Sequence, residues 1–291
     1  MRYILIAILI IISTLQSLFC RIYSGCYPGE EHMASPVFST VSGFIVALAA
    51  LAVSGFSFTP AWQTILLGAA NAAVVTAYNT CMVRASQTGP YSVQMTFMLS
   101  GGILVPAVVS LAFGDHFSTV KWGAIALIVL SIWLVSRKKG EGKITNRAFL
   151  PLCLGLFLAN GAYGALFDVQ QRLTGEGEKE AMVAVTYAAM AVVSLAVSGV
   201  RRRGRLPGDF RQTKKSLLFL ILSSLVVAVA INLMVFILPL VDTTLLYTFD
   251  NAGVLLLSVL ASCVWFREKL SAVNVVGCTL MCAGLILMSL F

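Results

Sequence analysis

A carboxylate interrupts an otherwise apolar or small-residue stretch, LLYTFDNAGVLLLSV (245–259), in which Asp250 and Asn251 are adjacent. An Asp near the centre of a membrane-spanning helix costs about 2.5–3.5 kcal/mol on insertion scales. Burial also disfavours the charged form of a carboxyl group, which suits such a group to carrying a proton or pairing with a cation. We therefore predict that Asp250 exchanges a proton or contacts a positively charged group of a substrate.

The alternative is that Asp250 lies near the membrane edge. It follows the start of its apolar stretch by about two helical turns, where water could reach it or where Asn251 and Tyr247 could cap it. Among the acidic residues it alone lies well inside such a stretch, since Asp168 is closer to the end of another. No Lys or Arg lies in the core of a different stretch to pair with it, which favours a proton or an incoming cation.

Other polar residues recur at helical spacing within apolar stretches, and such residues tend to face the protein interior or a water-filled path. We expect them to orient a substrate by hydrogen bonds. The alternative for each is ordinary hydrogen bonding between helices, worth about 0.6 kcal/mol on average. The candidate substrate-binding residues, besides Asp250, are Gln16, Asn79, Gln94, Asn160, Tyr163, Asn232, Tyr247 and Asn251.

The elements that must hold these side chains are membrane-spanning helices. Of 291 residues, 59% are hydrophobic and 11% charged, with a mean hydropathy of +0.92, whereas soluble domains are about 45–50% apolar and about 25% charged. A span needs about 20 apolar residues, and helices satisfy their own backbone groups in lipid. We expect an all-α polytopic protein of the cytoplasmic membrane with ten transmembrane helices, at 3–20, 36–54, 62–83, 91–113, 120–136, 148–171, 181–199, 216–238, 243–266 and 271–290.

The net charge of +8 indicates membrane orientation and not nucleic-acid binding. The basic residues gather in RKKGEGKITNR (137–147) and RRRGRLPGDFRQTKK (201–215), as expected of cytoplasmic connections. With ten spans, sixteen of the twenty Lys and Arg residues lie at connections on one side. This asymmetry predicts that both termini lie outside. A signal peptide is the alternative for the N-terminus, but no small-x-small cleavage site follows the first apolar run.

An internal duplication organises the spans into two halves. At an offset of 153 residues, FGDHFSTV (113–120) aligns with FREKLSAV (266–273), and Asn79 aligns with Asn232. We predict a first repeat at 1–136, a basic linker at 137–147 and a second repeat at 148–291. Five spans per half force the halves into opposite orientations, as in many secondary transporters with a site near the midplane. The alternative is a duplicated bundle without a transport role.

The repeat ends carry a family likeness. The second half ends in Glu268-Lys269-Leu270-Ser271 and a span containing Gly277 and Gly284, and the first half has a weaker copy, Asp115-His116-Phe117-Ser118, with Ala124 and Ser131 in place of the glycines. This pattern resembles the drug/metabolite transporter (DMT) superfamily, EamA type. The resemblance implies a central cavity lined mainly by the first, third, fourth, sixth, eighth and ninth spans, with the last span of each half at the periphery.

The resemblance also implies that both termini are cytoplasmic, which conflicts with the charge asymmetry. A C-terminal reporter that is active only in the cytoplasm distinguishes the two orientations. Members of the superfamily carry amino acids, sugars, nucleotide sugars, amines and drugs, so the likeness indicates no substrate for this chain.

We therefore expect a secondary active transporter that moves a small organic metabolite or cationic compound by alternating access, coupled to protons, with export preferred. The alternatives are proton-coupled uptake of a polar nutrient such as an amino acid or amine, and, from another class, a lipid flippase or membrane scaffold. We expect no enzyme, because HExxH, GxSxG and paired intramembrane carboxylates are absent from the sequence. We expect no cofactor, metal or nucleic acid, and as partners the substrate, protons and the bilayer, with the chain a monomer or homodimer.

Overall fold

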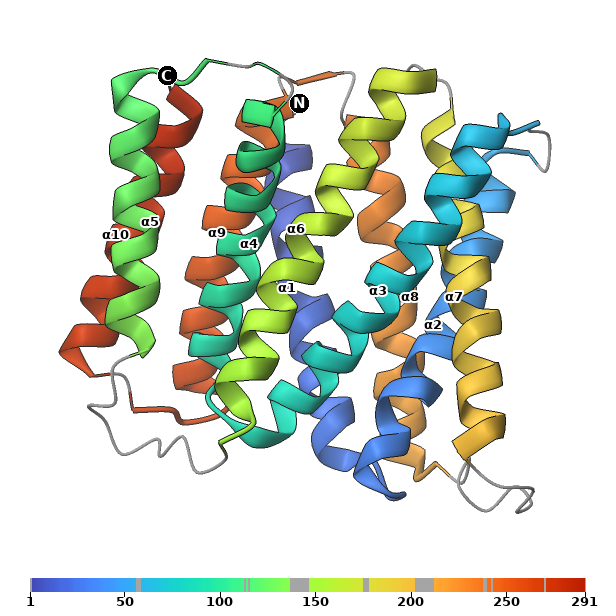
Figure 1. The fold of residues 1–291 in the computed structure, drawn as a ribbon. Coiled ribbons are helices and arrows are strands. Elements are labelled where there is room, and N and C mark those ends of the chain that lie inside the picture. Colours follow the sequence, from blue (N-terminus) through green and yellow to red (C-terminus); the bar gives the residue numbers. More distant parts are fainter. Residues whose placement is uncertain are drawn as a thin grey trace.

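The chain folds into a bundle of α-helices (Figure 1). The computed structural model describes residues 2–55, 59–112, 114, 116–136, 147–174, 178–201, 212–237, 240–241, 243–269 and 271–290. These residues form α1 (Arg2–Cys26), α2 (Glu31–Val53), α3 (Trp62–Thr88), α4 (Tyr91–Ala112), α5 (Thr119–Ser136), α6 (Phe149–Thr174), α7 (Lys179–Arg201), α8 (Lys214–Ile237), α9 (Thr243–Val264) and α10 (Ala272–Leu290). Asp115 and all of the predicted linker except Arg147 lie outside the described residues.

The lengths and composition of these helices fit a polytopic membrane protein. Within the described residues, nine helices are long and apolar enough to cross a membrane, and α10 contributes a shorter apolar stretch, Ala272–Met288. The prediction of an all-helical multi-pass membrane protein is confirmed at this level.

Several helices are longer than their apolar stretches. The first runs on to Cys26 and the third to Thr88, and the second begins at Glu31 before its apolar stretch starts. Backbone hydrogen bonding continues through polar residues at the membrane surface, whereas hydropathy marks only the hydrocarbon layer. The sequence therefore locates each helix but underestimates its ends.

Consecutive helices run in opposite directions, so the bundle has two distinct ends. Both termini lie at one end, at the top of Figure 1, which we call the terminal end. The last residues of α5 and α7, Ser136 and Arg201, lie at the other end, which we call the basic end because the two basic segments follow these residues in the sequence.

The most extensive helix pairings join residues far apart in the sequence. They are α2 with α7, α5 with α10, α1 with α8, α3 with α6, and α4 with α6. The α5–α10 pair lies at one side of the bundle (Figure 1), as expected for peripheral spans. Helices from the beginning and the end of the chain are thus interleaved around the centre.

Two glycines allow α4 and α6 to touch backbone to backbone near the middle of the bundle. A Cβ atom added at Gly101 would lie 2.0 Å from the carbonyl oxygen of Phe157, and one added at Gly161 would lie 2.4 Å from the carbonyl oxygen of Gly101. Small residues at such crossings permit the close packing that drives helix association in lipid. The approach of α4 to α6 therefore depends on both glycines.

Substituting Gly101 tests this crossing. Gly101→Ala should lower the melting temperature of the detergent-purified protein by several degrees, because overpacking typically costs about 1–3 kcal/mol. Gly123→Ala on α5 is the matched control, since a Cβ there meets no atom within 4 Å. Equal melting temperatures for the two variants would contradict the proposed backbone contact.

Candidate ligand cavity

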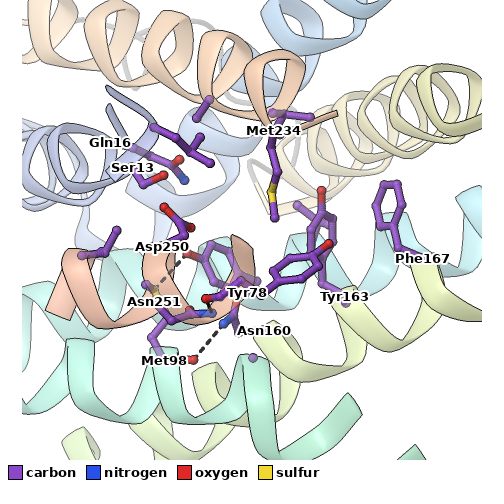
Figure 2. Close-up of a pocket in the computed structure, with 18 of the residues that line it drawn as sticks. Ser13, Gln16, Tyr78, Met98, Asn160, Tyr163, Phe167, Met234, Asp250 and Asn251 are labelled. Atoms are coloured by element: carbon purple, nitrogen blue, oxygen red, sulfur yellow. Dashed lines mark hydrogen bonds between the residues drawn. The ribbon is translucent and has the colours of Figure 1, made fainter. Parts of the chain in front are cut away.

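A cavity of about 210 Å³ lies among the central helices, with lining residues from α1, α3, α4, α6, α7, α8 and α9 (Figure 2). Its walls include mid-helix residues such as Val75 and Met98. They also include Gln171, Lys179 and Val235, which lie in helix turns at the terminal end. The cavity therefore extends from the centre of the bundle toward the terminal end.

The lining helices include the six that the family resemblance implies, and also α7. Lys179, Val183 and Tyr187 recur every four residues on α7, so one face of this helix supplies all three. Lys179 is only 6% exposed although it is the first residue of its helix. Sequence reasoning missed this face, although its spacing was visible in the sequence.

Among the described residues that line the cavity, Asp250 is the only acidic one. Its side chain lies beside Ser13 and Gln16 of α1 (Figure 2). Its Oδ1 is buried and has no hydrogen-bond partner among the described residues. A buried carboxylate oxygen without a donor is costly, so this position is suited to a ligand.

Asn251 does not cap Asp250, contrary to the alternative drawn from the sequence. Its Nδ2 donates to the carbonyl oxygen of Tyr247, 2.7 Å away on the preceding turn. Asn160 uses its amide in the same way, since its Nδ2 donates to the carbonyl oxygen of Met98 at 2.8 Å. Both amide nitrogens are therefore engaged by backbone carbonyls.

Aromatic side chains form much of the remaining wall, as in many small-molecule sites. The rings of Tyr163 and Phe167 meet edge to face with centroids 5.0 Å apart. The hydroxyl of Tyr78 donates to the sulfur of Met98 at 3.1 Å, and Tyr187 also lines the wall. The cavity thus combines one carboxylate with a largely apolar surface that includes several aromatic rings.

Six of the nine predicted residues line this cavity: Gln16, Asn160, Tyr163, Tyr247, Asp250 and Asn251. The other three do not. Gln94 joins α4 to α3, with its Nε2 donating to the carbonyl oxygen of Met82 at 3.0 Å and its Oε1 accepting from Ser86 at 3.1 Å.

The two asparagines at equivalent repeat positions also lie outside the lining. Asn79 is 6% exposed and its Nδ2 contacts the sulfur of Met190 at 3.3 Å. Asn232 donates to the carbonyl oxygen of Ala228 on its own helix at 2.8 Å. The contacts of Gln94, Asn79 and Asn232 therefore agree with the alternative interpretation, hydrogen bonding within the bundle.

The basic end of the bundle carries an ion pair that joins α1 to the α9–α10 connection. Nη2 of Arg21 lies 3.1 Å from Oε1 of Glu268, and each side chain is 15% exposed. Nη1 of Arg21 donates to the carbonyl oxygen of Gly89 at 3.1 Å. The guanidinium carbon lies 4.5 Å from the ring centre of Phe266 and 5.3 Å from that of Tyr91.

Glu268 also caps the start of α4. Its Oε1 accepts from the backbone N–H of Tyr91 at 2.7 Å, and its Oε2 accepts from the backbone N–H and hydroxyl of Ser92 at 3.3 and 3.1 Å. The hydroxyls of Tyr91 and the cavity-lining Ser17 are 2.5 Å apart. We call Arg21, Tyr91, Ser92 and Glu268 the seal, because together they tie α1, α4 and the α9–α10 connection at the basic end.

Neither the cavity nor the rest of the described structure groups three or more His, Cys, Asp or Glu side chains in a way that could hold a metal ion. The described lining offers a ligand one carboxylate, the ammonium group of Lys179, amide and hydroxyl groups, and aromatic and aliphatic side chains.

Comparisons with known proteins show similarity of fold only. No protein-family profile and no curated protein sequence matches the chain. One solved structure, described only as the crystal structure of a protein, superposes with a TM-score of 0.64 at 13% sequence identity, covering 98% of this chain and 97% of its own. At that identity the likeness extends to the arrangement of the helices along the whole chain and not to function.

Replacing the unsatisfied carboxylate should stabilise the empty protein. Asp250→Asn is expected to raise the melting temperature in detergent near pH 8, because the neutral amide removes the penalty of burying a charge without a full set of donors. Asp168→Asn is the control, since Asp168 is exposed and pairs with Arg172 at 2.9 Å. If Asp250→Asn lowers the melting temperature while the control leaves it unchanged, the carboxylate contributes to stability and this interpretation is wrong.

Proposed function

We propose that the chain is a secondary active transporter of small organic molecules, of the EamA type within the drug/metabolite transporter superfamily. The observation that carries the proposal is the cavity at the centre of the interleaved helices, with one partly unsatisfied carboxylate inside it and a polar seal at one end. A structural bundle has no evident use for such a costly group, whereas a transporter requires a binding site of this kind near its centre.

The pattern of helix pairings supports the inverted-repeat part of the proposal. If each helix is exchanged for the one five places away, α1–α8 becomes α6–α3, α4–α6 becomes α9–α1, and α3–α7 becomes α8–α2, all of which are pairs in contact. The pairs α2–α7 and α5–α10 are converted into themselves. These correspondences are expected of two five-helix halves related by a pseudo-two-fold axis, although the α1–α3 pair has no α6–α8 counterpart of similar extent among the described residues.

Alternating access then requires the seal to break while the terminal end closes. Arg21 lies on the first half and Glu268 on the second, so their ion pair joins the halves at the basic end. An exposed ion pair is worth little, but this one is mostly buried and shares its carboxylate with the start of α4. The seal therefore stabilises the state in which the basic end is closed. It consists of a few contacts, which can break when that end opens.

Asp250 is the proposed coupling residue. The carboxylate can bind either a proton or a cationic group of the substrate. Binding of one therefore competes with binding of the other, which couples proton movement to substrate movement. Export follows if the basic end is cytoplasmic and the substrate enters from there. Proton-coupled uptake of a polar nutrient uses the same residues in the opposite direction.

Lipid flippase and scaffold functions are the alternatives from other classes. The purified protein in liposomes should accumulate or release a soluble substrate, which neither alternative would do.

The coupling role has a direct test. A thermal-shift screen against amines, amino acids and sugars supplies a ligand, and its transport is then measured in liposomes across a range of pH. Asp250→Asn should abolish transport or remove its pH dependence, with Asp168→Asn as control. If Asp250→Asn leaves both transport and its pH dependence unchanged, Asp250 is no proton carrier.

The seal can be tested by labelling from each side of the membrane. In a variant without native cysteines, Leu99→Cys places a thiol in the cavity wall. A membrane-impermeant maleimide should reach it from the terminal end, and from the basic end only slowly. Adding Glu268→Gln should increase labelling from the basic end severalfold, because the ion pair and the charged cap of α4 are lost.

Glu31→Gln is the control for this experiment, since Glu31 is an exposed acid in the first turn of α2 at the same end. Unchanged labelling from the basic end in Glu268→Gln would mean that the seal does not close the cavity.

A further inference from the structure

Several hydrogen-bond acceptors lie in the cavity around Asp250. Asn251 and Asn160 each donate one of their two amide N–H groups to a backbone carbonyl oxygen, that of Tyr247 and that of Met98, and their Oδ1 atoms can accept from a ligand. Oδ1 of Asp250 is buried without a donor among the described residues. Three side chains from two helices thus present oxygens in the same cavity.

A backbone carbonyl close to these residues lacks its usual helical donor. Gly102 lines the cavity, and the residue four positions later, Pro106, has no N–H group to donate to the Gly102 carbonyl oxygen. A Cβ added at Gly102 would lie 2.7 Å from Nδ2 of Asn160 and 3.8 Å from Oδ1 of Asn251. Gly102 is therefore next to both asparagines, and any side chain there would intrude on them.

Two of the aromatic side chains, Tyr163 and Phe167, lie apart from Asp250 and Asn251. In Figure 2, Asp250 and Asn251 lie on one side of the cavity together with Ser13 and Gln16 of α1, whereas Tyr163 and Phe167 of α6 lie on the other side. A ligand that spans these two sides therefore has the carboxylate of Asp250 near one end and the rings of Tyr163 and Phe167 near the other.

We propose that the cavity binds a small primary amine with an aromatic or apolar tail, its ammonium group among the oxygens of Asp250, Asn251, Asn160 and Gly102 and its tail against Tyr163 and Phe167. This rests on the proposed function and names the substrate class of that site. A primary ammonium group has three donors and no acceptor, which matches a set of acceptors around one negative charge. A quaternary ammonium group has no donor and would leave these oxygens unsatisfied.

Phenethylamine is the probe, with two comparators of similar size. 2-Phenylethanol lacks the charge, and phenethyltrimethylammonium keeps the charge but has no N–H group. Binding to the purified full-length protein is measured by calorimetry at constant ionic strength. We expect each comparator to bind at least about tenfold more weakly than phenethylamine, because charge-assisted hydrogen bonds are lost in both cases.

Two substitutions locate the ammonium group. Asp250→Asn should weaken phenethylamine binding by about tenfold or more. Asn251→Leu should weaken phenethylamine but leave the quaternary compound unchanged, whereas Asn232→Leu, the same change outside the cavity, should alter neither. Monodisperse elution and a measurable melting transition establish that each variant is folded.

Three outcomes would overturn the proposal. The first is equal or tighter binding of the quaternary compound, and the second is phenethylamine binding that survives Asp250→Asn. The third is stabilisation by Na⁺ over K⁺ without any by phenethylamine, which would assign the oxygens to a metal ion. These experiments distinguish the amine proposal from the transport proposal. Asp250-dependent transport of another ligand would contradict amine binding and leave the proposed function intact. Phenethylamine binding without movement across the liposome membrane would contradict transport alone.

Discussion

The central physical constraint on this structure is the burial of a carboxylate within a bundle that spans lipid. Asp250 lies beside Ser13 and Gln16, and one of its carboxylate oxygens is buried without a hydrogen-bond partner among the described residues. In hydrocarbon such a group would be too costly to retain, so the surrounding helices must leave space for water, a proton or a ligand. The cavity among the seven central helices satisfies this requirement. The close α4–α6 crossing at Gly101 and Gly161 fixes the wall that faces the carboxylate.

Glu268, in contrast, is a carboxylate with hydrogen bonds to both of its oxygens. Its two oxygens accept from two backbone N–H groups, a hydroxyl and a guanidinium group. Those contacts hold α1, α4 and the start of the α9–α10 connection together. One acid therefore joins helices from distant parts of the chain, and another is left incompletely paired in the cavity among them. This contrast is what separates a structural carboxylate from one that is available to a ligand.

The helices could be predicted well from the sequence, because a stretch of about twenty consecutive apolar residues is typical of a membrane-spanning helix. It also placed Asp250 and its neighbours on a cavity face, since helical spacing shows which side chains share a face. Spacing does not show what that face meets. Asn79, Asn232 and Gln94 share the same kind of pattern, yet each has a partner within the bundle.

The contribution of α7 was missed for a related reason. Lys179 lies at the edge of an apolar stretch and would be assigned to the membrane surface, but its helix begins there and packs against α3. Tyr187, eight residues later on the same face, reaches the cavity because of that packing. Interhelical packing of this kind depends on tertiary contacts that a single sequence does not reveal.

The most direct test of the account is whether the two ends of the bundle open in alternation. Pulsed electron spin resonance can measure one distance at each end in a variant without native cysteines. Labels at Gly25 and Trp265 report on the basic end, and labels at Trp62 and Leu173 on the terminal end, all at exposed positions. Alternating access predicts two populations at each end, which shift in opposite directions when a ligand is added or the pH is changed. A single, unchanging distance at both ends, with a transported ligand bound and without it, would contradict alternating access.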